Sequence, residues 1–165
     1  MRLSRWQYEL FGRSESVYQL VLHILSPILQ IGVILWLAVV WKTVPKLVPS
    51  HYDAAGVITD YSAKGLLWTL PVIGCVSDIV LWATTHLPED AWSTGVRVTP
   101  FNAALVHRCI RDLIAEMRFA MSLMFAVLSV LAILRLERYP VYVPIVIVAL
   151  LFLPVVKYLV RVLKK

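Results

Sequence analysis

The stretch Gln19–Trp41, which reads QLVLHILSPILQIGVILWLAVVW, contains 23 consecutive residues without a formal charge. A helix needs about 20 apolar residues to cross a hydrocarbon core of roughly 30 Å. The stretch is too long for the apolar core of a cleavable signal sequence, and no small-residue cleavage pattern follows it. We therefore predict that it spans a membrane.

The composition of the 165-residue chain supports this prediction. Apolar residues make up 60% of it, the mean hydropathy is +0.78, and only 16% of the residues are charged. Soluble domains carry roughly 25% charged residues, and disordered chains are rich in charge and poor in aliphatic residues. These values exclude both classes and indicate an integral membrane protein embedded in a lipid bilayer.

Three more apolar segments are long enough to cross the bilayer with the help of their flanks. The predicted spans cover about residues 19–41, 65–85, 117–136 and 139–160. They must be helices, because an open sheet would leave backbone groups without hydrogen bonds in lipid. We predict an all-α, four-helix transmembrane bundle as a single domain over residues 19–165, preceded by an N-terminal interfacial arm at residues 1–18.

Lys and Arg are distributed unevenly between the segments that flank the uncharged cores of the predicted spans. The N-terminal arm, the loop between the second and third spans and the C-terminal end contain 11 of them, against five in the other two loops. Cytoplasmic segments carry the excess of basic residues, so we predict that both termini are cytoplasmic. The formal net charge of +6 then reflects topology and gives no reason to expect nucleic-acid binding.

Residues 100–117 show the pattern of an amphipathic helix that runs into the third span. Apolar residues such as Val106 and Ile110 recur at helical spacing, and Arg108, Arg111 and Glu116 fall between them. We expect this cytoplasmic interfacial helix to lie along the inner leaflet, with its basic face toward anionic headgroups. It is either a brace for the second and third spans or a partner- or lipid-binding helix.

Three polar residues stand out inside the predicted spans: Gln30, Asp78 and Lys157. An acid near the middle of the bilayer costs at least about 2.5 kcal/mol on insertion scales, so Asp78 should face the bundle interior and have a partner. Gln30 and Lys157 lie at depths from which either could be that partner. Asp78 is either a packing contact that fixes helix register or the ionisable group of a proton or ion path.

The most informative loop is the segment 42–64 between the first two spans. Residues 44–57 read VPKLVPSHYDAAGV, in which Pro45 and Pro49 prevent the helix from continuing. Asp53 and Gly56 suit the first and fourth positions of a tight turn. The candidate ligand-binding residues of this loop are Pro49, His51, Tyr52, Asp53, Gly56, Asp60 and Lys64.

The order Pro49-x-His51-Tyr52-Asp53-x-x-Gly56, followed by Lys64, resembles a prokaryotic membrane domain of unknown function found in the sporulation-delaying-toxin immunity protein. Members of that family more often have Asn where this chain has Asp53. The resemblance covers about residues 40–135. It implies a prokaryotic cell membrane and, for the best-known relative, immunity to an exported peptide toxin together with a role in signalling.

Three classes of function follow from these residues. The one we favour is a small membrane protein without enzymatic activity that binds an external ligand through loop 42–64, such as an extracytoplasmic peptide or another membrane protein. The second is a membrane-embedded hydrolase or transferase that uses His51 and Asp53, and the third is a transporter subunit that uses Asp78.

The same residues set the expectations for cofactors and oligomeric state. His51 and Asp53 alone are too few ligands for zinc, which takes at least three from the protein. We therefore predict no metal, no cofactor and no catalytic residue. Because four helices form a thin bundle, a homodimer is one expected oligomeric state.

Overall fold

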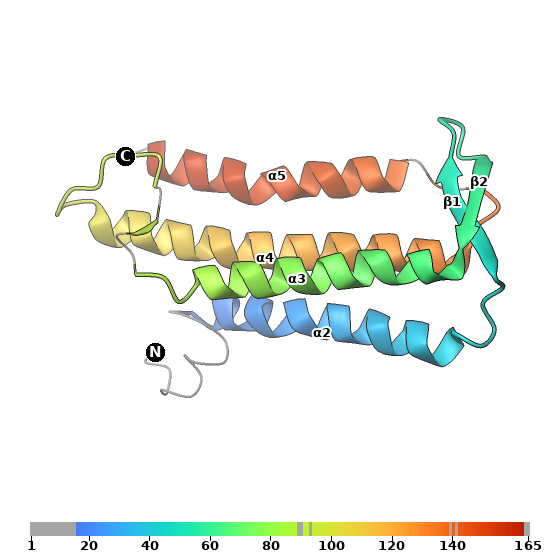
Figure 1. Ribbon diagram of the computed structural model, residues 1–165. Coiled ribbons are helices and arrows are strands. Elements are labelled where there is room, and N and C mark those ends of the chain that lie inside the picture. Colours follow the sequence, from blue (N-terminus) through green and yellow to red (C-terminus); the bar gives the residue numbers. More distant parts are fainter. Residues whose placement is uncertain (1–15, 89–90, 93, 139, 141, 164–165) are drawn as a thin grey trace.

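A computed structural model describes residues 16–88, 91–92, 94–138, 140 and 142–163 of the chain. Among these residues, four helices are long and apolar enough to cross a membrane, which confirms the predicted four-helix bundle. They are α2 (Val17–Val40), α3 (Thr69–Thr84) with the preceding 3-10 helix η1 (Lys64–Trp68), α4 (Ala103–Leu134) and α5 (Tyr142–Leu163) (Figure 1). Most of the predicted N-terminal arm lies outside the described residues.

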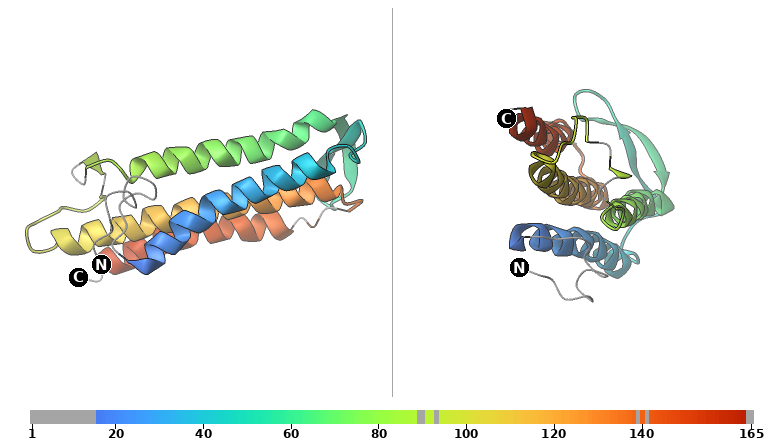
Figure 2. Two further views of the ribbon diagram at one scale, coloured as in Figure 1. Left: turned by 90° about the horizontal axis from the view of Figure 1, so that it is seen from below. Right: turned by 90° about the vertical axis from the view of Figure 1, so that its left-hand side faces the viewer.

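The four helices lie side by side with α4 in the middle (Figure 2). α4 packs against α2, α3 and α5, and α2 also contacts α3. α2 begins and α5 ends at one end of the bundle, which we call the basal end, and the opposite end is called the hairpin end (Figure 1). The candidate spans found among the described residues thus indicate a multi-pass membrane protein.

A β-hairpin that we did not predict covers the hairpin end. Strand β1 (Leu47–Tyr52) pairs antiparallel with β2 (Ile58–Ala63), and the register is irregular on both sides of His51. β-Branched residues such as Val48 and Ile58 favour extended backbone. The backbone N–H of Lys64 donates to the carbonyl of Lys46 (3.0 Å), which closes the base of the hairpin just as η1 begins.

α4 is one uninterrupted helix of 32 residues, about 48 Å long at 1.5 Å per residue. The amphipathic segment expected at residues 100–117 forms its first half and continues into the third span without a break. Its apolar face is buried, largely against α5. There, Val106, Cys109 and Ile110 pack around Tyr158.

The outward faces of the bundle are apolar, and polar groups are gathered inside. On α2, Leu25, Ile28, Leu35 and Val39 are exposed, as suits a helix that lipid surrounds. The buried residues of α2, in chain order, are Gln19, Leu22, His23, Ser26, Gln30, Val33 and Leu37. The interior face of α2 is therefore largely polar near the basal end and apolar near the hairpin end.

Candidate functional site

Asp53 and Gly56 shape the turn of the hairpin. Oδ1 of Asp53 accepts hydrogen bonds from the backbone N–H groups of Ala55 (2.8 Å) and Val57 (2.9 Å). Gly56 has a φ of 77°, a left-handed conformation that glycine adopts without strain. The predicted tight turn is thus confirmed, and this carboxylate oxygen is committed to holding it.

Tyr52 and Lys64 fasten the hairpin to the bundle. The Tyr52 hydroxyl donates to the backbone carbonyl of Leu136 in the α4–α5 loop (3.3 Å). Burial, with a smaller contribution from Tyr61, raises the pKa of the Tyr52 phenol above its ordinary value, so the group stays a donor at neutral pH. Lys64 Nζ donates to the carbonyl of Trp41 (3.3 Å) and lies 4.4 Å from the centroid of the Trp41 ring.

His51 and Asp60 face each other across the hairpin on its exposed surface. His51 Nδ1 lies 3.7 Å from Asp60 Oδ2, and the two side chains are 71% and 65% exposed. The acidic neighbour of His51 is therefore Asp60, whereas the carboxylate of Asp53 serves the turn. Within the described part of the chain, no group of three or more His, Cys, Asp or Glu side chains is arranged to hold a metal ion.

An apolar groove of about 340 Å³ lies beneath β1. Its walls are β1, the η1–α3 junction and the last turns of α4. Ser50, Tyr52 and Thr69 supply its polar side chains, and most of the remaining wall consists of Val48, Pro49, Leu66, Leu67, Leu70, Leu128 and Ala132. The hairpin end thus combines an exposed polar pair with an apolar groove, and Pro49 belongs to the groove.

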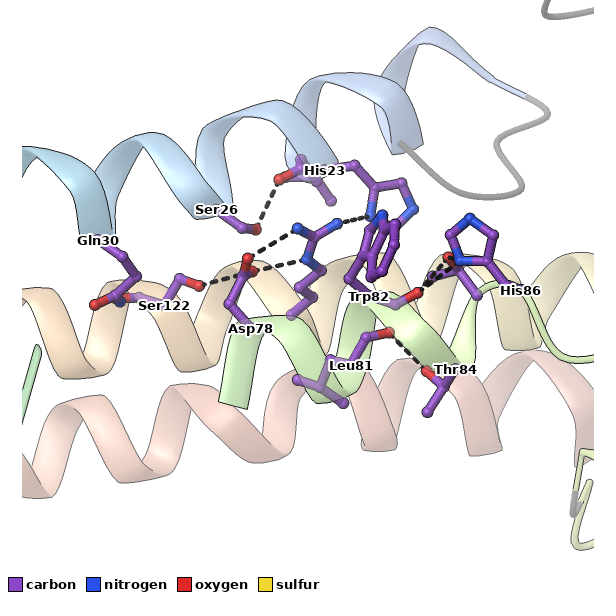
Figure 3. Close-up of polar contacts among 12 residues, drawn as sticks. His23, Ser26, Gln30, Asp78, Leu81, Trp82, Thr84, His86 and Ser122 are labelled. Carbon is purple, nitrogen blue, oxygen red and sulfur yellow. Dashed lines mark hydrogen bonds and ion pairs between the residues drawn. The ribbon is translucent and has the colours of Figure 1, made fainter. Parts of the chain in front are cut away.

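A second candidate region is a cluster of charged and polar side chains inside the basal half (Figure 3). Arg118 of α4 forms a bidentate ion pair with Asp78 of α3, with Nε–Oδ1 2.7 Å and Nη2–Oδ2 2.9 Å. The Ser122 hydroxyl also donates to Asp78 Oδ1 (3.3 Å). The charged side chains are only 4% and 8% exposed. A paired acid inside a bundle avoids the cost of an isolated charge in lipid.

His23 of α2 completes this cluster. Its Nδ1 lies 3.3 Å from Nη1 of Arg118. Because a guanidinium has no acceptor, Nδ1 must accept this hydrogen bond, and the imidazole is neutral in this arrangement. Figure 3 shows His23, Asp78 and Ser122 pointing toward one another from three helices. His86, whose ring lies 4.6 Å from that of Trp82, follows nearer the basal end.

Gln30 lies beside the cluster, near the middle of the bundle. Its Nε2 donates to the backbone carbonyl of Ser122 (2.7 Å), and its Oε1 is buried without a hydrogen-bond partner among the residues that the structure describes. Gly74 of α3 faces this amide. A methyl group at Gly74 would overlap both Gln30 Oε1 and Phe125 Cβ, so the missing side chain lets the three helices meet here.

These contacts correct the predicted partner of Asp78. Gln30 binds a backbone carbonyl of α4, and Lys157 pairs with Glu116. The prediction was wrong because the third span is expected to begin at about residue 117, which places Arg118 at the edge of the membrane. α4 extends 15 residues beyond Arg118 on the basal side, which places Arg118 in the middle of a long helix.

The sequence does contain a signal for this cluster. Buried polar residues of α2 are spaced four, three and four apart, and those of α4 seven, four and seven apart, which keeps each set on one helix face. Polar stripes in membrane helices face the bundle interior, so matching the two stripes identifies Arg118. The residues are Gln19, His23, Ser26 and Gln30 on α2, and Arg111, Arg118, Ser122 and Ser129 on α4.

Nearer the basal end, two acids of α4 tie α2 and α5 together in a two-rung ladder. On the α5 side, Glu116 pairs with Lys157, and Asp112 pairs with Arg161 (2.9 Å). On the α2 side, each acid accepts one hydrogen bond, Glu116 from Tyr18 (3.0 Å) and Asp112 from Gln19 (2.8 Å). The charged face of the amphipathic segment is thus used between helices.

One segment of the chain matches a known protein family. Residues 28–75 match the family described as "Domain of unknown function (DUF1648)". The matched segment runs from α2 through the hairpin and η1 into α3, so it contains all the loop residues that the sequence singled out. No curated protein and no solved structure matches the chain. The segment is therefore similar to a membrane-type family whose function is unknown.

Proposed function

We propose that the chain is a small integral membrane protein without enzymatic activity, which binds an external ligand or partner through residues 42–64. The observation that carries this proposal is the fastened hairpin, which presents His51 and Asp60 to solvent close to an apolar groove. Binding sites typically combine apolar walls with a few placed polar groups on a preformed scaffold. A hydrolase built on His51 and Asp53 has less support, because Asp53 is engaged in the turn.

In this proposal the protein lies in a prokaryotic cell membrane, with both termini in the cytoplasm and the hairpin outside. The charge bias supports this orientation. Without Arg111 and Arg118, which are buried in α4, nine Lys and Arg remain on the side of the termini against five on the hairpin side. The family resemblance extends the proposal to a role in immunity or signalling.

The orientation is tested by labelling Ser50→Cys in intact cells with a membrane-impermeant maleimide. The parent chain, which carries the free thiols of Cys75 and Cys109, is the control. We expect the variant to react before lysis and the parent to remain unlabelled. Reaction of the variant only after lysis would overturn the external position of the hairpin.

Ligand capture is tested with a photoreactive amino acid at His51 or at Asp60. The matched control carries it at Val39, which is 80% exposed on the outward face of α2 near the same end of the bundle. We expect a discrete adduct, defined by its mass, from the two hairpin positions and none of that mass from the control. An identical adduct pattern at all three positions contradicts the proposal.

A transporter subunit is the second candidate, and one observation favours it: a buried Arg118–Asp78 pair in contact with His23. Ionisable groups held inside a bundle are a feature of proton and ion paths. The discriminating variant is Asp78→Asn. If the chain is a transporter subunit, this variant should abolish transport while photocapture at His51 persists. If the chain is a binding protein, the variant should keep its function as long as the bundle folds.

A further inference from the structure

The groove beneath β1 opens onto a surface that lipid surrounds. Leu66, at its edge, is 47% exposed, and Val72 and Ile73, which continue the outward face of α3, are also exposed. An occupant of the groove therefore meets apolar side chains on the way toward the bundle centre. In the other direction it meets the polar hairpin, where Ser50 and Tyr52 form the wall. The site fits a molecule with one apolar and one polar end.

The α4 wall of the groove suits a hydrocarbon chain better than a helix. Its α4 wall extends from Leu128 to Ala132, about 6 Å along the helix axis, and its η1–α3 wall from Leu66 to Leu70. A bound amphipathic helix uses anchors at positions i, i+3, i+4 and i+7, which span about 10 Å. The α4 wall alone is shorter than that set, although the β1 wall from Val48 to Tyr52 spans about 13 Å. An alkyl chain has no such spacing requirement.

The charge at the hairpin end favours an anionic head group. Among the described loop residues at this end, five are basic (Lys42, Lys46, Lys64, Arg135 and Arg138) and three are acidic (Asp53, Asp60 and Glu137). The exposed Arg135 follows Ala132 of the groove wall by three residues. Arg138 reaches the hairpin turn, where its Nε donates to the carbonyl of Ala55 (3.3 Å). Arginine binds phosphate oxygens through several N–H groups.

The hydroxyl of Tyr52 joins these two features. The ring lines the groove, and the hydroxyl donates to the carbonyl of Leu136, between the two arginines. We propose that the groove holds the upper part of one alkyl chain of an anionic phospholipid, whose phosphate lies beside Arg135 and Arg138. This inference rests on the proposed function and names the class of ligand that the hairpin end binds.

The experiment measures the phospholipid that remains on the protein. The full-length protein is first placed in nanodiscs of equal parts phosphatidylglycerol and phosphatidylcholine. It is then transferred to mild detergent, and native mass spectrometry identifies and counts the lipids that stay bound. We expect one retained phospholipid per chain, with phosphatidylglycerol preferred at least fivefold. Ala132→Phe and Leu128→Phe, which fill the groove from α4, should each reduce retention at least tenfold, and Arg135→Gln should reduce the preference to about one.

The matched control is Gly32→Leu. Gly32 lines a second apolar groove, of about 420 Å³ between α2 and α4, and has open space where a side chain would be. No hairpin residue lines that groove, so filling it should leave retention unchanged. Helix content and melting temperature of every variant establish that it is folded.

Four results would overturn the inference: no retained phospholipid, equal retention of both lipids by the parent, retention that survives both phenylalanine variants, or equal loss in Gly32→Leu. A dimer mass that disappears in Ala132→Phe would also overturn it and make a second copy of the chain the occupant. The proposed function fails separately, if Ser50→Cys reacts only after lysis, because lipid retention is measured without reference to orientation.

Discussion

The two halves of the bundle interior are held together by different forces. In the basal half, an apolar cluster around Tyr158 lies beside buried polar contacts, in which His23, Asp78, Arg118 and Ser122 join three helices. In the hairpin half the core is apolar, and its buried members are Val33, Leu37, Val44, Val48, Leu67, Ala126 and Ile133. In lipid, apolar helix faces gain little by leaving their surroundings. The hairpin half therefore depends on close packing, whereas the basal half depends also on its buried polar contacts.

This difference indicates which half specifies the helix partners. An apolar face packs against lipid almost as well as against another helix. A bidentate pair such as Arg118–Asp78 is satisfied only in one register of α3 against α4. We therefore expect substitutions in the basal half to be costlier and more selective than those in the hairpin half.

The largest effect is expected for Arg118→Leu. It leaves Asp78 buried without its cation, and breaking a buried ion pair costs about 3–5 kcal/mol of unfolding free energy. Reversible unfolding in mixed micelles, titrated with a denaturing detergent, measures this. The double variant Asp78→Leu with Arg118→Leu should recover most of the loss, because an apolar pair of similar volume leaves no charge behind. A double variant as unstable as the single would remove the distinction between the halves.

In the hairpin half, Leu37→Ala probes packing alone. Leu37 is 0% exposed, and its truncation should cost about 2 kcal/mol, near the lower end of the range for soluble cores, since lipid reduces the transfer contribution. The same unfolding assay measures it. The outward-facing Leu35→Ala is the control and should change stability by less than about 0.5 kcal/mol. A loss at Leu37 as large as that at Arg118 would contradict the comparison.

Gly74→Ala tests the point at which the two halves meet. The added methyl group overlaps Gln30 and Phe125, and crowding of this kind costs about 1–2 kcal/mol. Gly32→Ala adds the same group in open space, where the better helix propensity of alanine gives a gain of up to about 1 kcal/mol. Melting temperatures that move in opposite directions would show that the helices meet closely at Gly74 and not at Gly32. Equal shifts would show that a residue without a side chain is not needed at position 74.

The smallest effects are expected at the two rungs of the ladder. Lys157→Met removes the partner of Glu116 on a side chain that is 34% exposed and should cost about 1 kcal/mol. Arg161→Met removes the partner of Asp112 at a more exposed position and should cost about 0.5 kcal/mol. Raising the salt concentration should reduce both differences in unfolding free energy. Insensitivity to salt would mean that neither rung contributes electrostatically.

The membrane-spanning helices could be predicted because the hydropathy of a segment depends only on its own residues. The first span was predicted at residues 19–41 and is observed as α2, Val17–Val40. The hairpin was missed because its strands lack a clear alternation of buried and exposed residues: β2 is largely exposed, and β1 contains Pro49. The Asp53–Gly56 turn was predicted correctly, since its chemistry is local. The partner of Asp78 was not, because it depends on the length of α4.

α5 is attached to the bundle chiefly through α4, and its exposed face is apolar over most of its length. Everything else that distinguishes the molecule, including the hairpin, the groove and the Arg118–Asp78 pair, is formed by residues that precede it in the chain. The first three described helices therefore make these contacts without any residue of α5. Asp112 and Glu116 of α4 are the docking points at which α5 joins them, through Arg161 and Lys157.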